Sequence, residues 1–358
     1  MTAGFSSLIW SSAIAAGLLF ACVGCVTTPA TTTWKGATPA TDGPVLFSGF
    51  VAENPPFPES HASTLVETSD GVMAAWFGGT HEKHPDVCIW TARFDGRAWS
   101  APTRVADGVQ ADGTRHPCWN PVLHQPKQGP LLLFYKVGPS PSRWWGMIIT
   151  SRDAGRTWST PRRLPEGQLG PIRNKPVVLP DGSLLCPSST EDDGWRVQME
   201  RTPDLGATWE RSGPLNSREA FGAIQPTILQ WPDGRTQILN RSRQKVITEC
   251  WMKNGDWRQW TPMERTQLPN PNSGIDATVL HDGRGLLVFN DSDSRRTPIS
   301  VALSADGKEW RTVLTLEDVK DGELSYPAVI QTRDQLVHIS YTWKRKTIRH
   351  VILDPRKL

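Results

Sequence analysis

The hydrophobic positions of this chain fall into short runs that recur about every 50 residues. Six of these runs share one pattern: a polar residue, then a small residue or proline, then apolar and often β-branched residues, then a turn. They occupy residues 61–66, 120–123, 174–179, 225–229, 276–280 and 326–330. Five of the turns contain glycine, at Gly71, Gly129, Gly182, Gly234 and Gly283, and a second apolar run follows each turn. Apolar runs joined in this way predict β-hairpins.

A second motif keeps the same period. Residues 151–158 read Ser-Arg-Asp-Ala-Gly-Arg-Thr-Trp, residues 202–209 nearly repeat this, and 304–310, 95–99 and 254–257 are shorter versions. We interpret the motif as a tight turn between the two outer strands of a repeat. Its Asp or Ser side chain binds backbone N–H groups, its glycine takes the left-handed conformation, and its tryptophan packs against the neighbouring repeat. This explains much of the count of 17 tryptophans against three tyrosines.

Four strands per repeat make one blade, so the sequence predicts an all-β, six-bladed β-propeller over residues 44–358. The sixth repeat lacks the turn motif, and the chain ends after its third strand. Residues 45–51 precede the first repeat and form an apolar strand of suitable length. We therefore expect the N- and C-terminal strands to share the last blade and close the ring, which removes the open sheet edges.

The first 43 residues are set apart from these repeats. Residues 8–26 are apolar and small, with no charged residue from there to Lys35, which indicates a signal peptide over residues 1–25. The surroundings of Cys22 and Cys25 resemble a bacterial lipoprotein processing site, and a plain cleaved secretory signal is the alternative. Residues 26–43 are expected to be a flexible linker. The protein is thus expected to be exported, either periplasmic or anchored to the outer membrane by lipid, or secreted.

The charge and the cysteine and histidine positions limit which binding partners and cofactors are expected. The net charge of +3 is too small to indicate nucleic acid, and it leaves the lipid anchor as the expected membrane contact. The remaining cysteines, Cys88, Cys118, Cys186 and Cys250, show no metal-ligand spacing. We expect them to be buried free thiols, with a disulfide between two of them as the alternative. The histidines lack ligand spacing and no nucleotide-binding glycine loop is present, so no metal or cofactor is expected.

The alternation of strand directions places the start of each first strand and the end of each second strand on one face. The residues that open the six repeats form a ring there: His61, Asn120, Asn174, Gln225, Asp276 and Tyr326. The ends of the second strands add Lys136, Glu191, Arg241, Arg243, Asn290 and Lys344, and nearby loops add Glu82, His84, Asp86, Arg115, His116, Arg173 and Arg296. Clustered arginines suit a carboxylate or a sulfate, because the guanidinium group binds planar anions through two hydrogen bonds. A ligand that carries a carboxylate or a sulfate is therefore expected.

These motifs resemble the sialidase superfamily, the glycosidases built on six-bladed propellers with Asp-box repeats. The resemblance implies a tyrosine nucleophile at Tyr326, in Ser-Tyr-Pro, and carboxylate-binding arginines at Arg296 and at Arg241, with Arg243 as the alternative. It also implies a loop acid at Glu82, with Asp86 close by. Three positions depart from the family pattern, and the first is this loop acid, which is an aspartate in the family. His61 stands where the family has its first arginine, and Gln225 stands where a glutamate would pair with the tyrosine, so a tyrosine there has no carboxylate partner to activate it.

Three functions follow from this ring. The first is a glycoside hydrolase acting on a terminal acidic sugar, either sialic acid-like or a uronic acid, in which Arg241, Arg243, Arg296, Asn120, Lys136 and Asn174 bind substrate. Tyr326 then acts at the anomeric carbon, Glu82 or Asp86 is the acid, and Asp276 is available as a base in an inverting route. The second is a polysaccharide lyase or His-based glycosidase that uses His61 with Tyr326. The third is a non-catalytic glycan-binding lipoprotein.

Overall fold

The computed structural model describes Met1 and residues 43–358. The predicted signal peptide, including Cys22 and Cys25, and the predicted linker lie outside the described residues, apart from Met1 and Gly43. No helix in the described part of the chain is long and apolar enough to cross a membrane.

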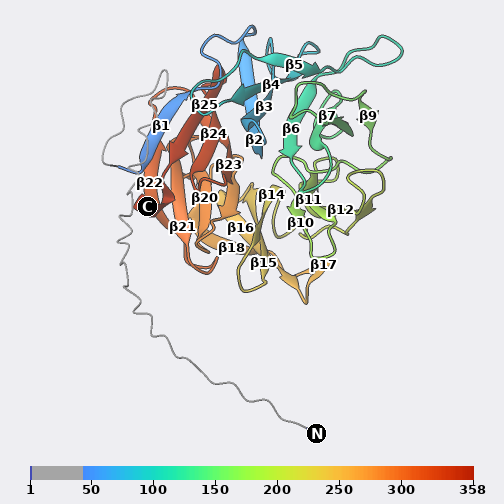
Figure 1. Ribbon diagram of the computed structural model, residues 1–358. Coiled ribbons are helices and arrows are strands. Elements are labelled where there is room, and N and C mark those ends of the chain that lie inside the picture. The colour runs from blue at the N-terminus through green and yellow to red at the C-terminus, as the bar shows by residue number, and fades with distance from the viewer. Residues whose placement is uncertain (2–42) are drawn as a thin grey trace. The chain divides into compact units, whose positions relative to one another are not determined.

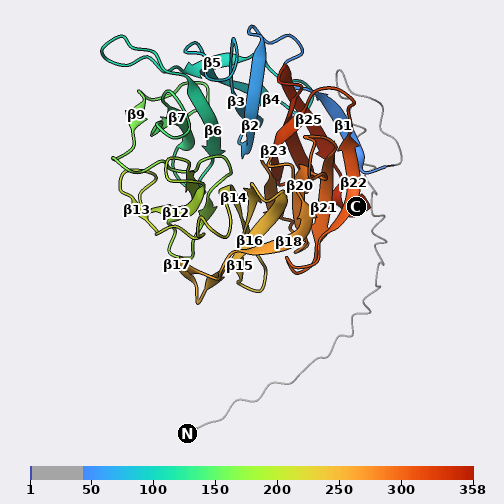
Figure 2. The ribbon, with the colours of Figure 1, turned by 180° about the vertical axis from the view of Figure 1, so that it is seen from behind.

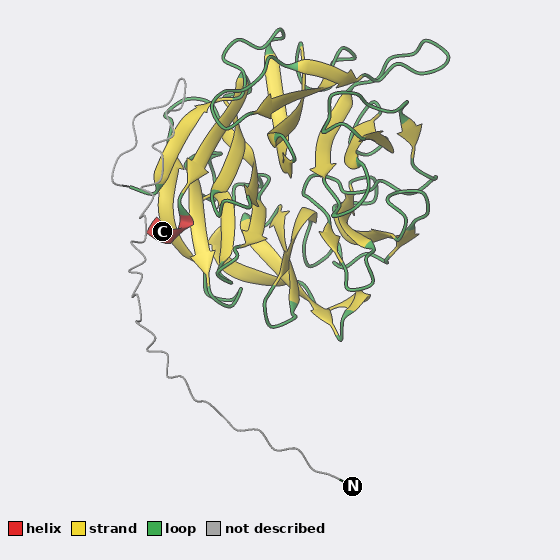
Figure 3. Cartoon of the chain, viewed as in Figure 1, coloured by secondary structure: helices red, strands yellow, loops and turns green. Residues whose placement is uncertain are grey.

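Residues 43–358 form six antiparallel sheets arranged in a ring (Figures 1 and 2). Strands and loops make up almost all of it, and one short 3₁₀-helix, η1 (Pro355–Lys357), ends the chain (Figure 3). The first blade is β2 (Glu59–Thr68), β3 (Gly71–Gly79), β4 (Cys88–Phe94) and β5 (Thr103–Ala106), and the second is β6 (Cys118–His124), β7 (Leu131–Val137), β8 (Trp145–Ser151) and β9 (Arg162–Arg163). The third is β10 (Val177–Val178), β11 (Leu184–Thr190), β12 (Arg196–Thr202) and β13 (Glu210–Arg211).

The fourth blade is β14 (Ala223–Gln230), β15 (Thr236–Ser242), β16 (Val246–Lys253) and β17 (Asp256–Trp260), with β18 (Glu264–Pro269) also paired to β16. The fifth is β19 (Asp276–Val279), β20 (Gly285–Asn290), β21 (Ile299–Ser304) and β22 (Arg311–Glu317), and the sixth is β23 (Leu324–Gln331), β24 (Val337–Trp343), β25 (Thr347–Leu353) and β1 (Val45–Phe50). The six-bladed propeller predicted from the repeats is confirmed.

The closure of the ring is also as predicted. β1 pairs antiparallel with β25, and Ser48 lies opposite Val351. The N-terminal strand therefore completes the blade that the C-terminal repeat leaves one strand short. The ring is held together by strands from both ends of the domain.

Four of the six inner strands carry a bulge at the same position. The pairing of the first and second strands is interrupted between His61 and Thr64, Trp119 and Val122, Ile224 and Thr227, and Ser325 and Ala328. One bulge residue in each strand has a left-handed backbone, namely Ala62, Asn120, Gln225 and Tyr326. In three of these strands proline follows, and it suits a bulge because it has no N–H to donate to the sheet. The polar–proline pattern of the repeats thus coincides with a β-bulge, which changes the direction of a side chain.

The Asp-box turns are structural, as predicted. In the second blade the Ser151 hydroxyl accepts a hydrogen bond from Gly155 N at 2.8 Å, and Asp153 accepts one from Thr157 N at 2.8 Å. Gly155 has a φ of 80°. In the third blade the Trp209 ring packs edge-on against Phe134 of the second, with ring centres 6.0 Å apart. The four cysteines of the propeller are buried free thiols, which confirms that expectation.

Candidate functional site

Tyr326 lies at the centre of a cluster of basic side chains drawn from several blades. The guanidinium carbons of Arg173, Arg241 and Arg296 lie 5.3, 5.6 and 5.8 Å from the centre of its ring. The His61 ring lies 4.2 Å from it, centre to centre. Arg173 precedes β10, Arg241 is in β15, Arg296 precedes β21 and His61 is in β2, so five blades meet at this residue. The structure therefore brings His61, Arg241, Arg296 and Tyr326 together, as the repeat pattern predicted.

The Arg241 side chain donates three hydrogen bonds to other side chains at this site. It donates from Nη1 to the Tyr326 hydroxyl at 2.6 Å and to Gln225 Oε1 at 3.1 Å, and from Nε to Asn272 Oδ1 at 3.0 Å. Its side chain is only 5% exposed. Gln225 thus serves as a neutral acceptor that orients the guanidinium group. Because Arg241 donates to the phenol oxygen, the phenol proton is available to another acceptor.

His61 is a buried neutral imidazole beside the tyrosine. Its Nδ1 lies 2.9 Å from Thr342 Oγ1. Its Nε2 has no hydrogen-bond partner within residues 43–358. Burial, followed by the charges of Arg345, Arg296, Arg173 and Arg241, holds the pKa of His61 well below 6.5. The imidazole is therefore uncharged at neutral pH and able to accept a proton or a hydrogen bond.

Two carboxylates hold the outer arginines. Glu323 Oε2 lies 3.3 Å from Arg296 Nη1, and Glu323 Oε1 accepts from Arg345 Nε. Arg345 also binds Glu82, with 2.7 Å between Nη1 and Oε2. Burial raises the pKa of Glu323, but the charges of Arg345 and Arg296 outweigh it and the net shift is downward. Glu82, predicted as the loop acid, is therefore at the site and ion-paired.

Glu191 is a further carboxyl group at the site. It follows β11, is half-buried, and its pKa is raised by burial against the opposing effects of Arg241, a hydrogen bond with Trp195, and Arg243. The guanidinium carbons of Arg241 and Arg243 lie 5.2 and 4.4 Å from the centre of the Trp195 ring. Arg243 therefore borders the site through Trp195. A carboxyl group with a raised pKa suits a general acid.

Asp86, the other predicted loop acid, makes its contacts within its own loop. Asp86 lies between β3 and β4, where it accepts hydrogen bonds from Thr80 N at 3.0 Å and Thr80 Oγ1 at 2.6 Å. It also lies 2.8 Å from His84 Nδ1. Burial raises its pKa, but the bonds from Thr80 and His84 outweigh this and the net shift is downward. These contacts stabilise the turn of that loop around a charged carboxylate.

Four predicted residues are buried, and three of them, Asp276, Asn174 and Lys136, link neighbouring blades. Asp276 is 2% exposed, and its carboxylate binds Lys175 Nζ at 2.9 Å, Thr227 Oγ1 at 2.8 Å and Val329 N at 2.9 Å. Asn174 donates to the carbonyls of Gln225 and Pro226. Lys136 is fully buried and donates to Pro171 O at 2.7 Å, and Asn120 is 5% exposed. These contacts hold the inner strands together.

Three residues at the site were not among the residues selected from the sequence: Thr342, Glu323 and Arg345. A local signal exists for Arg345, because Lys344 and Arg345 are the two central residues of the turn between β24 and β25, and both have positive φ, 51° and 60°. Asn-Gly is usual in such turns. Two cations in place of Asn-Gly indicate a function for the turn. Among residues 43–358 no group of three or more His, Cys, Asp or Glu side chains is arranged to hold a metal ion.

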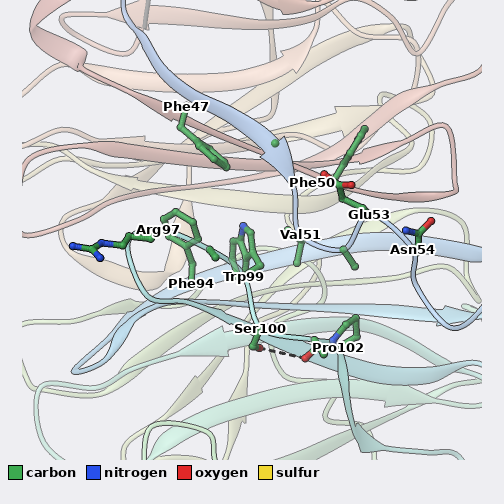
Figure 4. Close-up of a pocket in the computed structure, with 14 residues that line it drawn as sticks. Phe47, Phe50, Val51, Glu53, Asn54, Phe94, Arg97, Trp99, Ser100 and Pro102 are labelled. Carbon is green, nitrogen blue, oxygen red and sulfur yellow. Dashed lines mark hydrogen bonds between the residues drawn. The ribbon is translucent and has the colours of Figure 1, made fainter. Parts of the chain in front are cut away.

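A separate cavity lies at the rim, where the first and last blades meet (Figure 4). It has a volume of about 360 Å³ and is lined by Phe47, Phe50, Phe94 and Trp99, among others. None of the predicted site residues lines it. This cavity belongs to the seam that closes the ring rather than to the arginine cluster.

Solved structures share this architecture at low sequence identity. A protein of unknown function from Dyadobacter fermentans aligns with a TM-score of 0.71 and 17% identity, over 86% of this chain and 97% of that one. A Hadza microbial sialidase aligns with a TM-score of 0.70 and 19% identity, over 84% and 66%. The NanB sialidase from Streptococcus pneumoniae (K499G mutant) aligns with a TM-score of 0.68 and 12% identity, over 89% and 71%. At these identities the likeness shows the fold alone.

No protein of curated function matches the sequence. The model of the BNR repeat-like domain matches residues 70–339, which include the Asp-box turns and most of the site. The chain therefore belongs to the BNR repeat-like domain family, and it has the six-bladed propeller fold of these solved structures.

Proposed function

We propose that the protein is an exported, sialidase-like glycoside hydrolase that acts on a terminal acidic sugar of a glycan. The observation that carries the proposal is the convergence of Arg173, Arg241 and Arg296 on the ring of Tyr326, with Arg241 bonded to its hydroxyl. A site built in this way stabilises an anion next to a group able to act at a sugar carbon.

The charge balance supports an anionic ligand. The arginines at the site are Arg173, Arg241, Arg243, Arg296 and Arg345, against the carboxyl groups of Glu82, Glu191 and Glu323. Five positive groups against three carboxyl groups leave an excess of two positive charges when all three are ionised. The sugar carboxylate is assigned to Arg241 and Arg296, because planar guanidinium groups bind a carboxylate through paired hydrogen bonds.

The bond-breaking roles follow from protonation and position. Glu191 carries the carboxyl group whose pKa burial raises, so it is assigned to protonate the leaving oxygen. Glu82, held by Arg345, is placed second for this role. The Tyr326 oxygen stabilises or attacks the anomeric carbon as positive charge develops there.

A second candidate function is elimination on a uronic acid. The observation that favours it is the contact between neutral His61 and Tyr326, together with an amide at Gln225 where a carboxylate would activate the tyrosine. In this route His61 Nε2 removes the proton from the carbon next to the carboxylate. A C=C bond forms, the bond to the leaving oxygen breaks, and Tyr326 donates its proton to that oxygen.

One panel of glycans separates these functions. The purified protein is incubated with sialosides, uronosides and sulfated oligosaccharides, and both reducing sugar and the ultraviolet absorbance of unsaturated uronates are followed. Release of an acidic monosaccharide without that absorbance supports hydrolysis, and appearance of the absorbance supports elimination. Binding to an acidic glycan without turnover of any substrate would make the protein a glycan-binding module and would reject both enzymatic proposals.

The anion assignment has its own control. Arg296→Ala should abolish discrimination in favour of the acidic sugar over its carboxyl-reduced form. Arg333→Ala is the matched variant, because Arg333 is exposed in the turn between β23 and β24, on the opposite face. Equal losses in the two variants would show that the effect is unrelated to the site.

A further inference from the structure

A strongly basic cavity adjoins the proposed sugar site. It has a volume of about 490 Å³ and opens next to Arg296 and Arg345. Its charged lining consists of Arg295, Arg296, Lys320, Lys344, Arg345 and Glu323. Five cationic side chains thus face one carboxylate across a space open to solvent.

The pairing of these cations leaves two of them unmatched. Glu323 binds Arg296 and Arg345. Arg295 lies 3.5 Å from Asp318, and both side chains are more than half exposed, which makes this a weak pair. Lys320 and Lys344 have no carboxylate within 4.0 Å in the described part of the chain. Positive charge at Lys320 and Lys344 is therefore not neutralised by an ion pair.

The backbone at Lys344 is held in an unusual conformation. Lys344 and Arg345 occupy the two central positions of a turn closed by a hydrogen bond from Lys346 N to Trp343 O at 3.0 Å. Their positive φ values are uncommon for long side chains. Two neighbouring segments bind this turn, the loop before β23 through Lys344 N to Glu323 O and strand β2 through Ser60 N to Arg345 O, each at 2.7 Å. Strain maintained by surrounding contacts is characteristic of functional positions.

The side chain of Lys344 is also guided by packing. A Cβ atom on Gly322 would come within 3.1 Å of Lys344 Cγ, so the absence of a side chain there lets the lysine stem lie over the loop. Its Nζ lies 5.0 Å from the centre of the Trp343 ring. The turn, the glycine and the tryptophan together fix a cation at the edge of the cavity.

We propose that this cavity is a second anion subsite, which binds a sulfate ester or carboxylate on the sugar next to the terminal acidic one. The inference rests on the proposed function, because it takes the terminal carboxylate to lie at Arg241 and Arg296. Arg296 borders both spaces, so the two anions of one substrate would lie on either side of it. Sulfate and carboxylate share the chemistry that an ammonium group recognises, which is charge with strong hydrogen-bond acceptors.

The test compares substrates that differ only in the second sugar. Three disaccharide glycosides carry the same terminal acidic sugar, with a neutral, a sulfated or a uronic second unit. For the wild type we expect kcat/KM to be higher for at least one of the two-anion substrates than for the neutral one. In the double variant K320Q/K344Q that ratio should fall roughly tenfold, through KM, because two exposed charge contacts are removed. The uronic and sulfated arms show which anion is bound.

Lys346→Gln is the matched control, since Lys346 is exposed in the same turn and does not line the cavity. A ratio that stays at the wild-type value in K320Q/K344Q, or that falls equally in Lys346→Gln, overturns the second subsite. Binding is measured separately by calorimetry with a heparin tetrasaccharide and its desulfated counterpart. If no substrate is turned over but only the double variant loses heparin affinity, the proposed function fails and the subsite stands.

Discussion

The sharpest test of the site is the exchange Arg241→Lys. This change keeps the positive charge but replaces a planar group with several fixed donors by a single ammonium nitrogen. In the structure the guanidinium group makes three side-chain hydrogen bonds, to Tyr326, Gln225 and Asn272, in a position only 5% exposed. A lysine cannot reproduce this geometry, so at least one of the three acceptors loses its donor.

The exchange should have two separate effects, one on the stability of the fold and one on ligand binding. A buried acceptor left without a donor costs about 1–3 kcal/mol, which for a domain of this size corresponds to a fall in Tm of roughly 1.5–4.5 °C. Loss of the paired hydrogen bonds to the substrate carboxylate removes about 1.5–3 kcal/mol of binding, or about 10- to 150-fold in affinity. The second effect should appear only with an acidic ligand.

The assay therefore uses two ligands and a thermal melt. The acidic sugar and its carboxyl-reduced form are compared for binding by calorimetry and for kcat/KM, in the wild type, Arg241→Lys and the surface control Arg333→Lys. We expect Arg241→Lys to lose its preference for the acidic sugar while Arg333→Lys keeps it. If acidic and reduced sugars are affected equally, Arg241 supports the scaffold and the carboxylate binds elsewhere.

Three further predictions concern individual protonation states. Glu191→Gln should lower kcat about 10²–10³-fold on glycosides with poor leaving groups and much less on nitrophenyl glycosides. Because the acid must be protonated to act, the substitution should also remove the fall in activity at high pH. Equal losses on both substrates would contradict this role. Burial lowers the pKa of His338 from 6.5 to about 4, so between these pH values the unfolded chain binds more protons than the folded one. The free energy of unfolding should therefore fall as pH falls from 6.5 to 4, and this residue should account for about 3 kcal/mol of the loss at pH 4. Urea unfolding of His338→Phe should show a shallower acid dependence, and the exposed His281→Phe should not. Burial likewise lowers the pKa of Lys136 from 10.5 to about 7, so its contribution to stability should increase as pH rises from 7 to 10.5. Urea unfolding of Lys136→Met at pH 7 and 9 should lack this increase. An unchanged increase would mean that the lysine is not the group responsible.

The local features of the fold were readable from the sequence because they are determined by neighbouring residues. Hairpin glycines, the Asp-box and the alternation of apolar runs each fix a few residues of backbone, and their period fixed the number of blades. Even the sharing of the last blade followed, since one repeat lacked a strand and residues 45–51 offered one. The bulges at Asn120, Gln225 and Tyr326 coincide with the polar–proline pairs but were not predicted from them.

The sequence did not separate the ring residues that face a ligand from those that are buried. Asp276, Asn174 and Lys136 have the same polar character as Gln225 and Tyr326, yet the structure commits them to contacts between blades. That distinction depends on which acceptor a neighbouring blade presents, and no local pattern carries this information. The same reason explains why Arg345 and Glu323 were not selected.

The sequence by itself thus determined the propeller, its closure and the face on which polar residues gather, because these depend on the period and turn chemistry of single repeats. Only the tertiary structure decided that Arg173, Arg241 and Arg296 converge on Tyr326, that His61 lies against it as a neutral base, and that Lys344 extends the basic surface outward. These side chains come from repeats far apart in the chain. Their spacing is fixed by how the blades pack around the axis, and packing between repeats is a property of the closed ring.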